Sequence, residues 1–404
     1  MIAARRSAGN VGPLLGGLSP AAFLRAYWQK RPLLVRQAIP GFRGIVSRDA
    51  FLALATRADV RSRLVIHHPR RTPARRWERH DGPFGALEAD MLPARGWTLL
   101  VNSVETLVRG GWEILRRFSF LPAARIDDLM ISYAADGGSV GPHDDLYDVF
   151  LLQGPGRRRW RVSSQGDRAV DPDAAIKVLQ SFVPEEEWVL EPGDMLYLPP
   201  GIAHHGVAEG PCFTYSIGFV APSHADLYRS FFSYLGELLG ANVDPRAIYE
   251  DPDLKPAAGA PHEIGDEMVA RMAAVVSGAR WTTADVADFL GRLLTRPKPQ
   301  VRFRAQARPL DRAAFERRIF ARSGPMRWLR LALPSRGLLR RGRLYLNGEA
   351  YAPARAALPS LRALLADRAL PFPLPRALTS DVAVATLHAW YVAGYVVVPG
   401  EGQG

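Results

Sequence analysis

Two histidines and an aspartate near the middle of the chain have the residue types of a metal site. His143 and Asp145 stand two apart in GPHDDLYDVFLLQG, and His204 follows later in LPPGIAHHG. Residues two apart on a strand point to the same face, so we expect Asp144 to point away from the site. Two imidazoles and one carboxylate on one face of an ion leave the opposite face open. This ligand set is typical of Fe(II) sites that also bind small molecules.

The sequence around each ligand supports this choice. An H-x-D pair occurs by chance in many chains, and a lone His143 would be read as an ordinary core or surface histidine. Here a glycine-rich turn precedes the pair, an apolar run follows it, and a Pro-Pro-Gly turn precedes the second histidine. Of the neighbours His204 and His205, strand alternation lets only one face inward. We choose His204, and the alternative that both are exposed stays open.

A nearby run of arginines indicates which small molecule the site takes. 2-Oxoglutarate needs a cation for its distal carboxylate, commonly the planar fork of an arginine. The stretch RRRWRV supplies Arg157, Arg158 and Arg159. On a strand Arg158 faces opposite to the other two, and because burying charge is costly we expect one inward arginine and not three. The alternative, an exposed basic edge strand that deters pairing, suits Arg157 and Arg159.

These residues lie in a β-rich block over residues 128–220. Short runs such as DLMISYA, YDVFLLQ, RRRWRV and DMLYLP follow one another closely, with Gly and Pro clusters between them. Such spacing predicts an antiparallel sandwich or barrel. Before the block we expect helices that start at Ser19-Pro20 and at Ser47, and a further helix across 103–118.

After the block the pattern changes to helices. Apolar residues at three- and four-residue spacing predict helices from residue 223 onward. A plausible linker, RPKPQ, ends at residue 300 and is followed by a smaller mixed unit, in which Asn347-Gly348 predicts a hairpin turn.

The composition is that of a globular protein with a basic end. Of 404 residues 48% are hydrophobic and 23% charged, and this length exceeds one ordinary core. The single cysteine, Cys212, is expected to be a small buried residue in a reducing cytoplasm. No apolar run approaches the roughly 20 residues of a membrane span.

The net charge of +12 is concentrated after residue 300, where 17 arginines and 6 acidic residues leave +11. A basic end suggests an anionic partner, first of all nucleic acid or a ribonucleoprotein. The competing explanation is a compositional bias, because arginine outnumbers lysine 48 to 4 in the whole chain.

Four stretches resemble bacterial JmjC-type ribosomal oxygenases: FLRAYWQKRPLLVR, FSFLPAARIDDLMISYA, GGSVGPHDDLYDVFLLQGPGRRRWRV and GDMLYLPPGIAHHGV. The likeness covers residues 20–220. It implies a mainly β core, a double-stranded β-helix of cupin type, in a catalytic domain over 1–222. It further implies a helical dimerisation region over 223–298 and a winged-helix-like α+β domain over 299–404.

The resemblance also implies an activity. The family's members are Fe(II)- and 2-oxoglutarate-dependent dioxygenases that use O2, and the substrate implied is an arginine side chain of large-subunit ribosomal protein sixteen. By matching positions, His143, Asp145 and His204 bind iron and are catalytic. Arg158 and Ser132 bind 2-oxoglutarate, and Ser216 in TYSIGF is a weaker candidate.

The partners that the resemblance implies are a ribosomal protein substrate, a second copy of the chain and, through the basic end, ribosomal RNA, with no membrane and a cytoplasmic location. Two alternatives remain open. One is a cupin metalloenzyme that does not use 2-oxoglutarate, which a test of 2-oxoglutarate binding would separate. The other is a non-enzymatic regulator that binds nucleic acid through the basic end, which a steep salt dependence of binding would favour.

Overall fold

The computed structural model describes residues 12–72, 75–85, 92–255, 262–321 and 327–398. The chain divides into two compact units. The first unit contains Met1–Ala221, Pro297–Leu338 and Pro353–Gly404, and the helical unit contains Pro222–Arg296 and Leu339–Ala352. The division into three consecutive domains stays a prediction.

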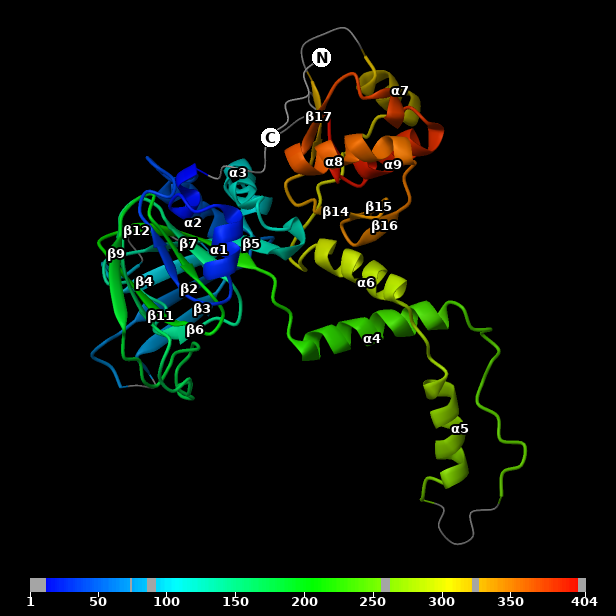
Figure 1. Ribbon diagram of the computed structural model, residues 1–404, viewed down its shortest axis with the longest axis horizontal. Coiled ribbons are helices and arrows are strands. Elements are labelled where there is room, and N and C mark those ends of the chain that lie inside the picture. Colours follow the sequence, from blue (N-terminus) through cyan, green and yellow to red (C-terminus); the bar gives the residue numbers. More distant parts are fainter. Residues whose placement is uncertain (1–11, 73–74, 86–91, 256–261, 322–326, 399–404) are drawn as a thin grey trace. The chain divides into compact units, whose positions relative to one another are not determined.

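Two antiparallel sheets form the body of the first unit (Figure 1). The large sheet has eight strands in the order β1 (Leu33–Val35), β10 (Met195–Leu198), β7 (Val149–Gln153), β12 (Cys212–Phe219), β5 (Ile126–Ala134), β4 (Trp97–Val101), β2 (Ser62–His67) and β3 (Trp77–Asp81). The small sheet has the order β6 (His143–Asp144), β11 (Ala203–Glu209), β8 (Arg157–Ser163) and β9 (Glu186–Leu190). The predicted mainly β core of short antiparallel strands is thus confirmed.

The large sheet uses its two faces differently. On one face alternate residues such as Ile131, Phe150 and Tyr215 join the main hydrophobic core, together with side chains of the N-terminal helices. The intervening residues, such as Ser132 and Thr214, point to the opposite face and line a cavity. This period of two is what a strand imposes, and it separates the core of the unit from its candidate site.

Helices α1 (Pro20–Ala26) and α2 (Arg48–Ala55) begin where the sequence predicts. Ser19 and Ser47 cap them, each accepting a hydrogen bond from a backbone N–H three residues on. The single helix expected across 103–118 is wrong, because a 3₁₀ turn at Val104–Thr106 precedes the shorter α3 (Arg109–Leu115). The two parts pack so closely that a Cβ on Gly111 would lie 2.6 Å from Glu105 Cα.

The remaining elements follow β12 along the chain. They are α4 (His224–Gly240), α5 (Asp266–Ser277), α6 (Thr283–Thr295), α7 (Arg312–Ile319), β13 (Trp328–Leu331), β14 (Gly337–Arg340), β15 (Arg343–Leu346), β16 (Glu349–Tyr351), α8 (Leu358–Asp367), β17 (Ala369–Pro371), α9 (Asp381–Val392) and β18 (Val396–Val397). Asn347 and Gly348 have φ of 53° and 90° and form the predicted turn between β15 and β16. No helix in the described part of the chain is long and apolar enough to span a membrane.

Candidate metal centre and its cavity

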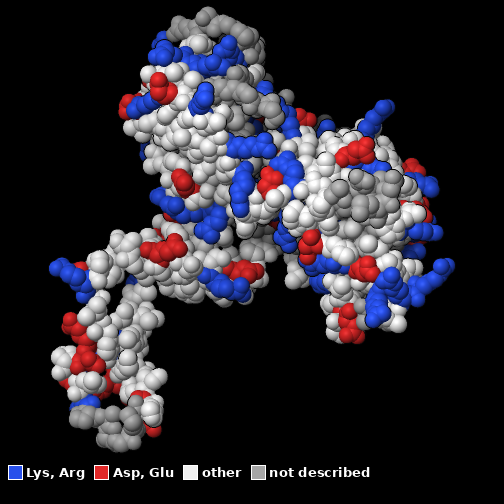
Figure 2. Space-filling model, turned by 180° about the vertical axis from the view of Figure 1, so that it is seen from behind, with Lys and Arg blue, Asp and Glu red and all other residues white. Residues whose placement is uncertain are grey.

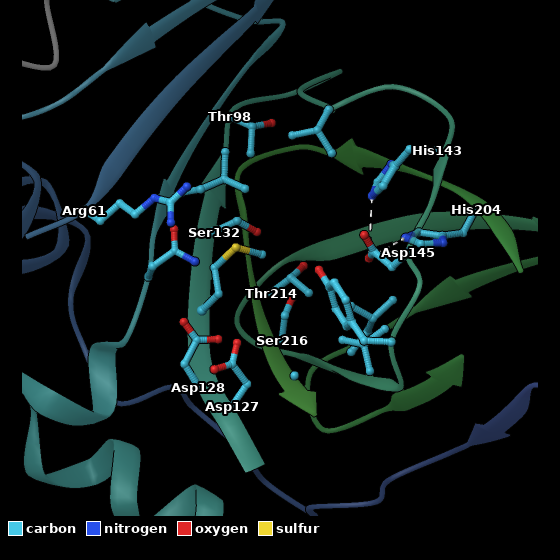
Figure 3. A pocket seen from close by; sticks show the side chains of 18 of the residues that line it. Arg61, Thr98, Asp127, Asp128, Ser132, His143, Asp145, His204, Thr214 and Ser216 are labelled. Atoms are coloured by element: carbon cyan, nitrogen blue, oxygen red, sulfur yellow. Dashed lines mark ion pairs between the residues drawn. The ribbon is translucent and has the colours of Figure 1, made fainter. Parts of the chain in front are cut away.

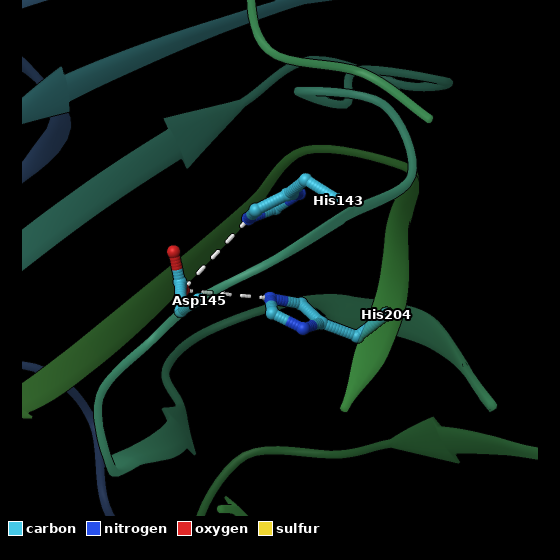
Figure 4. A group of neighbouring side chains, drawn as sticks. All are labelled: His143, Asp145 and His204. Carbon is cyan, nitrogen blue, oxygen red and sulfur yellow. Dashed lines mark ion pairs between the residues drawn. The ribbon is translucent and has the colours of Figure 1, made fainter. Parts of the chain in front are cut away.

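The three predicted ligands come together at one point of the first unit (Figure 4). Nε2 of His143 lies 3.9 Å and Nε2 of His204 lies 3.8 Å from Oδ2 of Asp145. One ligand atom from each residue can be chosen so that all three lie within 4.8 Å of one another. Bonds to a divalent ion are about 2.0–2.2 Å long, so one ion can reach all three after small side-chain rotations.

The pairing of β6 with β11 creates this geometry. His143 lies opposite His204 in the antiparallel register, and their ring centroids are 4.3 Å apart. Strand β6 ends at Asp144, so Asp145 reaches the site from just beyond the strand and not by alternation within it. The carbonyl of Asp145 accepts a hydrogen bond from the Gly201 N–H at 2.7 Å, which fixes the backbone at this point.

The neighbours of the ligands point elsewhere, as strand alternation predicts. The carboxylate of Asp144 binds the ammonium of Lys177 at 2.7 Å. His205 packs its ring edge-on against Phe182, whereas His204 is 3% exposed and faces the other ligands. Of the two adjacent histidines, the structure therefore brings His204 to the cluster.

The backbone just before each imidazole orients the ring. Nδ1 of His143 lies 3.0 Å from the carbonyl oxygen of Gly141, and Nδ1 of His204 lies 3.0 Å from that of Ile202. A carbonyl only accepts, so Nδ1 carries the proton and Nε2 presents its lone pair to the site. Burial, with the nearby charge of His143, lowers the pKa of His204 to about 4, which keeps this ring neutral and able to bind a metal.

The ligands line a cavity of about 200 Å³ between the two sheets (Figure 3). Strands β4, β5, β7 and β12 of the large sheet form one wall, and residues of β6, β8 and β11 form the other. Figure 3 shows the two imidazoles and Asp145 on one side, with the carboxylates of Asp127 and Asp128 away from them. The cavity therefore has a metal end and an acidic end.

Arg158 is the buried cation of this cavity. It is 3% exposed on β8, while its neighbour Arg157 is exposed, as the alternation predicts. Among the residues that the structure describes, no acceptor meets Nε or Nη2 of Arg158. An unpaired buried guanidinium is costly, so this residue fits an anionic ligand, and its fork suits a carboxylate.

Several hydroxyl groups also line the cavity. Ser132 on β5 is 4% exposed and lies opposite Thr214 on β12. The hydroxyls of Thr98 and Thr214 are buried and have no hydrogen-bond partner within the described part of the chain. Ser132 was predicted, and Ser216 also lines the cavity. Thr98 and Thr214 were missed, because nothing in the apolar runs WTLLV and CFTYSIGF indicates that the threonine of either run faces a cavity.

The acidic end was not predicted either. Asp127 and Asp128 stand together at the start of β5, and both carboxylates lie 3.1 Å from the ammonium of Lys298. Ser103 also donates to Asp128, from its backbone N–H and from its hydroxyl, each at 3.2 Å. These residues are far apart in sequence, and Lys298 lies in the segment that was expected to be only a linker.

Comparison with known proteins agrees with this geometry. The JmjC domain family matches residues 113–227, which include all three clustered residues. The ribosomal protein uL16 3-hydroxylase of Escherichia coli is 39% identical over 251 residues, which are 61% of this chain and 63% of that protein. That alignment thus spans just under two thirds of the relative's length.

Solved structures extend the likeness to nearly the whole chain. The structure of YcfD, a ribosomal oxygenase from Escherichia coli, superposes with a TM-score of 0.76 and 30% identity over 95% of this chain and 99% of that one. A structure of the same oxygenase in complex with cobalt and 2-oxoglutarate gives a TM-score of 0.74 at 30% identity and the same coverage. With its JmjC domain and this fold, the chain belongs to the JmjC-type ribosomal oxygenase family.

Proposed function

We propose that this chain is an Fe(II)- and 2-oxoglutarate-dependent hydroxylase that acts on a ribosomal protein, namely on an arginine side chain of uL16. One observation carries the proposal: a two-histidine, one-aspartate cluster shares its cavity with a buried arginine that meets no acceptor among the described residues. A cupin metalloenzyme without 2-oxoglutarate would leave that cation unexplained. A nucleic-acid-binding regulator would leave both features unexplained.

The proposed roles follow from position and chemistry. His143, Asp145 and His204 hold the iron, and Arg158 with Ser132 anchors the distal carboxylate of 2-oxoglutarate. When bound, iron(II) supplies the chemistry by which 2-oxoglutarate, O2 and a C–H bond become succinate, CO2 and an alcohol. The apolar side chains of Val149 and Leu151 line the same cavity and limit the access of water.

The acidic end supports a cationic substrate. Asp127 and Asp128 place two carboxylates at the side of the cavity away from the metal ligands. A guanidinium can bind both carboxylates at once through its fork. A side chain held there would extend its aliphatic carbons into the cavity, which is the part of an arginine that this chemistry hydroxylates.

A mass measurement tests the proposal. The iron-loaded protein is incubated with 2-oxoglutarate and a mixture of ribosomal proteins, and uL16 is expected to gain the mass of one oxygen. Arg158→Ala should raise the 2-oxoglutarate concentration required and leave metal binding nearly intact. The exposed neighbour Arg157, which pairs with Glu209 at 3.6 Å, provides the matched control Arg157→Ala. If the mass of uL16 stays unchanged although iron and 2-oxoglutarate are bound to the enzyme, the proposal that uL16 is the substrate is wrong.

We also propose that the helical unit pairs with a second copy of the chain. Helix α5 exposes an apolar stripe at helical spacing, with Met268, Met272 and Val276 between 40% and 74% exposed. Figure 2 shows the helices of this unit as largely white surface between scattered charged side chains. A row of exposed apolar side chains at this spacing supports a protein interface.

The basic end supports a contact with ribosomal RNA, and a cytoplasmic location follows from the proposed substrate. Arg302, Arg304, Arg308 and Arg317 are exposed in the first unit. Binding of a ribosomal RNA fragment should weaken steeply with salt, since each neutralised phosphate releases counterions. Affinity that stays constant as salt rises would contradict this part of the proposal.

A further inference from the structure

The acidic end of the cavity already holds a cation from the chain itself. The ammonium of Lys298 lies 3.1 Å from Oδ1 of Asp127 and 3.1 Å from Oδ2 of Asp128. The side chain of Lys298 is 32% exposed and lines the cavity beside them. Burial disfavours its charge, but the two carboxylates outweigh this and raise the pKa of Lys298, so the ammonium stays charged at neutral pH.

This ammonium neutralises the cavity as a whole. Besides His143, His204 and Tyr147, the ionisable lining comprises three acids and three cations: Asp127, Asp128 and Asp145, and Arg61, Arg158 and Lys298. The added charges of a divalent metal and the dianion 2-oxoglutarate cancel each other. The cavity should therefore attract a cationic substrate more strongly when the charge of Lys298 leaves the carboxylates.

Asp128 does not need Lys298 to keep its place. Its Oδ2 also accepts hydrogen bonds from the backbone N–H and the hydroxyl of Ser103, each at 3.2 Å. Only 9% of the Asp128 side chain is exposed, so the surrounding structure fixes the carboxylate. Removal of the ammonium would thus leave an ordered acceptor and not a collapsed one.

The type of residue at this position also matters. Lysine is rare in this chain, with 4 residues against 48 arginines, so a cation chosen by composition alone would be arginine. An ammonium is a compact point charge, whereas a guanidinium binds two carboxylate groups with a rigid fork of donors. A guanidinium that arrives from outside therefore has the better geometry for these two carboxylates.

We propose that Lys298 is an internal stand-in for the substrate's cation: it occupies the Asp127 and Asp128 carboxylates in the free protein and gives them up to the guanidinium of the substrate. The inference rests on the proposed function and adds a residue that sets substrate affinity and favours guanidinium over weaker cations. Pro297 and Pro299 flank Lys298 and restrict the backbone that carries it. The ammonium therefore remains close by after displacement and competes again once the product leaves.

The test is calorimetric binding of two probes to the full chain loaded with cobalt and 2-oxoglutarate. The probes are a uL16 peptide with its arginine and the same peptide with neutral citrulline. Lys298→Met should bind the arginine peptide roughly two- to fivefold more tightly, the effect of removing one partly exposed ion-pair competitor. The affinity of Lys298→Met for the citrulline peptide should equal that of the native protein. Lys298→Arg, a stronger competitor, should bind the arginine peptide more weakly than the native protein.

The control is Lys255→Met, which removes an exposed lysine paired with Glu267 at 3.3 Å in the helical unit. Equal or weaker binding of the arginine peptide by Lys298→Met would overturn the inference, because a lysine that only supports Asp128 gives that result. If Lys298→Met fails to fold, the affinity of Lys298→Arg for the arginine peptide decides. Weaker binding than by the native protein supports the inference, and equal or tighter binding overturns it. Absence of hydroxylated uL16 in the separate mass assay would instead refute the proposed function.

Discussion

Strand β12 and helix α5 both carry apolar side chains but bury them to opposite extents. All eight residues of Cys212–Phe219 are buried, whereas none of the twelve residues of Asp266–Ser277, all of them described, is buried. Strand β12 lies between β7 and β5, so one of its faces belongs to the core and the other to the cavity. The side chains of the strand are covered within its own unit, whereas the apolar side chains of α5 stay exposed in the single chain, which is why we propose that a second copy covers them.

The largest effect should come from the cavity, where two of the three clustered residues lie on strands of the small sheet. His143→Ala should lower substrate-stimulated succinate formation by more than about a hundredfold, because even partners behind a metal ligand are worth 10–100-fold. Iron binding should weaken in parallel, and the oligomeric state should stay as in the native protein. Succinate release in the presence of uL16 measures the effect, and unchanged turnover would remove His143 from the site.

Matched truncations should sharpen the contrast in burial. Phe150 on β7 is fully buried, with the rings of Phe118 and Tyr197 at 4.9 and 4.8 Å. Phe150→Ala should lower the free energy of unfolding by about 3–5 kcal/mol. Val275→Ala on α5, where the side chain is 75% exposed, should change it by less than about 0.5 kcal/mol at concentrations too low for dimers. Denaturant titrations measure both changes. Similar losses of unfolding free energy at the two positions would contradict the difference in burial between the sheet and α5.

Charges on α5 should break association without harming the fold. Val275→Lys with Val276→Lys should weaken self-association roughly a hundredfold if these side chains lie at the centre of the interface. Analytical ultracentrifugation gives the dissociation constant, and metal affinity measured in parallel should stay unchanged. A chain that sediments as a monomer before any substitution would disprove the proposed dimer.

The smallest effect concerns a buried carboxyl behind the cavity. Burial raises the pKa of Glu105 to about 7, and the charge of Asp128 adds to the shift. A raised carboxyl pKa means that the folded protein holds the proton more tightly than the unfolded chain does, which stabilises the folded state. This stabilisation is complete below pH 4.5, the pKa of the glutamate in the unfolded chain, and is lost as the pH rises through 7.

Relative to Glu105→Gln, the native protein should therefore lose on the order of 2 kcal/mol of unfolding free energy between about pH 5 and about pH 8. Denaturant unfolding at the two pH values gives the difference. The exposed Glu113 of α3 supplies the control Glu113→Gln, which should show no such dependence. A parallel pH dependence in the native protein and Glu105→Gln would exclude Glu105 as its source.

The local parts of this structure could be predicted from sequence. Strands such as β7 and β10 follow from short apolar runs between turns, and the alternation within β8 puts Arg158 inside and Arg157 outside. Alternation likewise separates His204 from His205. Alternation predicted that Asp145 joins the cluster, and it does. Its position does not come from alternation alone, because strand β6 ends one residue earlier, at Asp144. The roles of these residues remain predictions that the variants above address.

The parts that depend on distant contacts could not be predicted. Thr98, Thr214 and Lys298 meet in one cavity only because four strands of the large sheet and a segment after α6 converge there. No local pattern of residue types records that convergence. The helix expected across 103–118 failed for a similar reason, since the close approach of Gly111 to Glu105 depends on a turn that helical periodicity does not reveal.

The cross-strand pairing of His143 with His204 has a consequence for synthesis of the chain. The two histidines belong to strands that are separated by β7, β8, β9 and β10 in sequence, so no short fragment contains the site. A nascent chain cannot assemble this candidate metal centre until residue 204 has emerged and β11 has paired with β6. A slip of one residue in that pairing would turn one histidine to the opposite face. Metal uptake during translation would therefore report when the sheet has closed in its correct register.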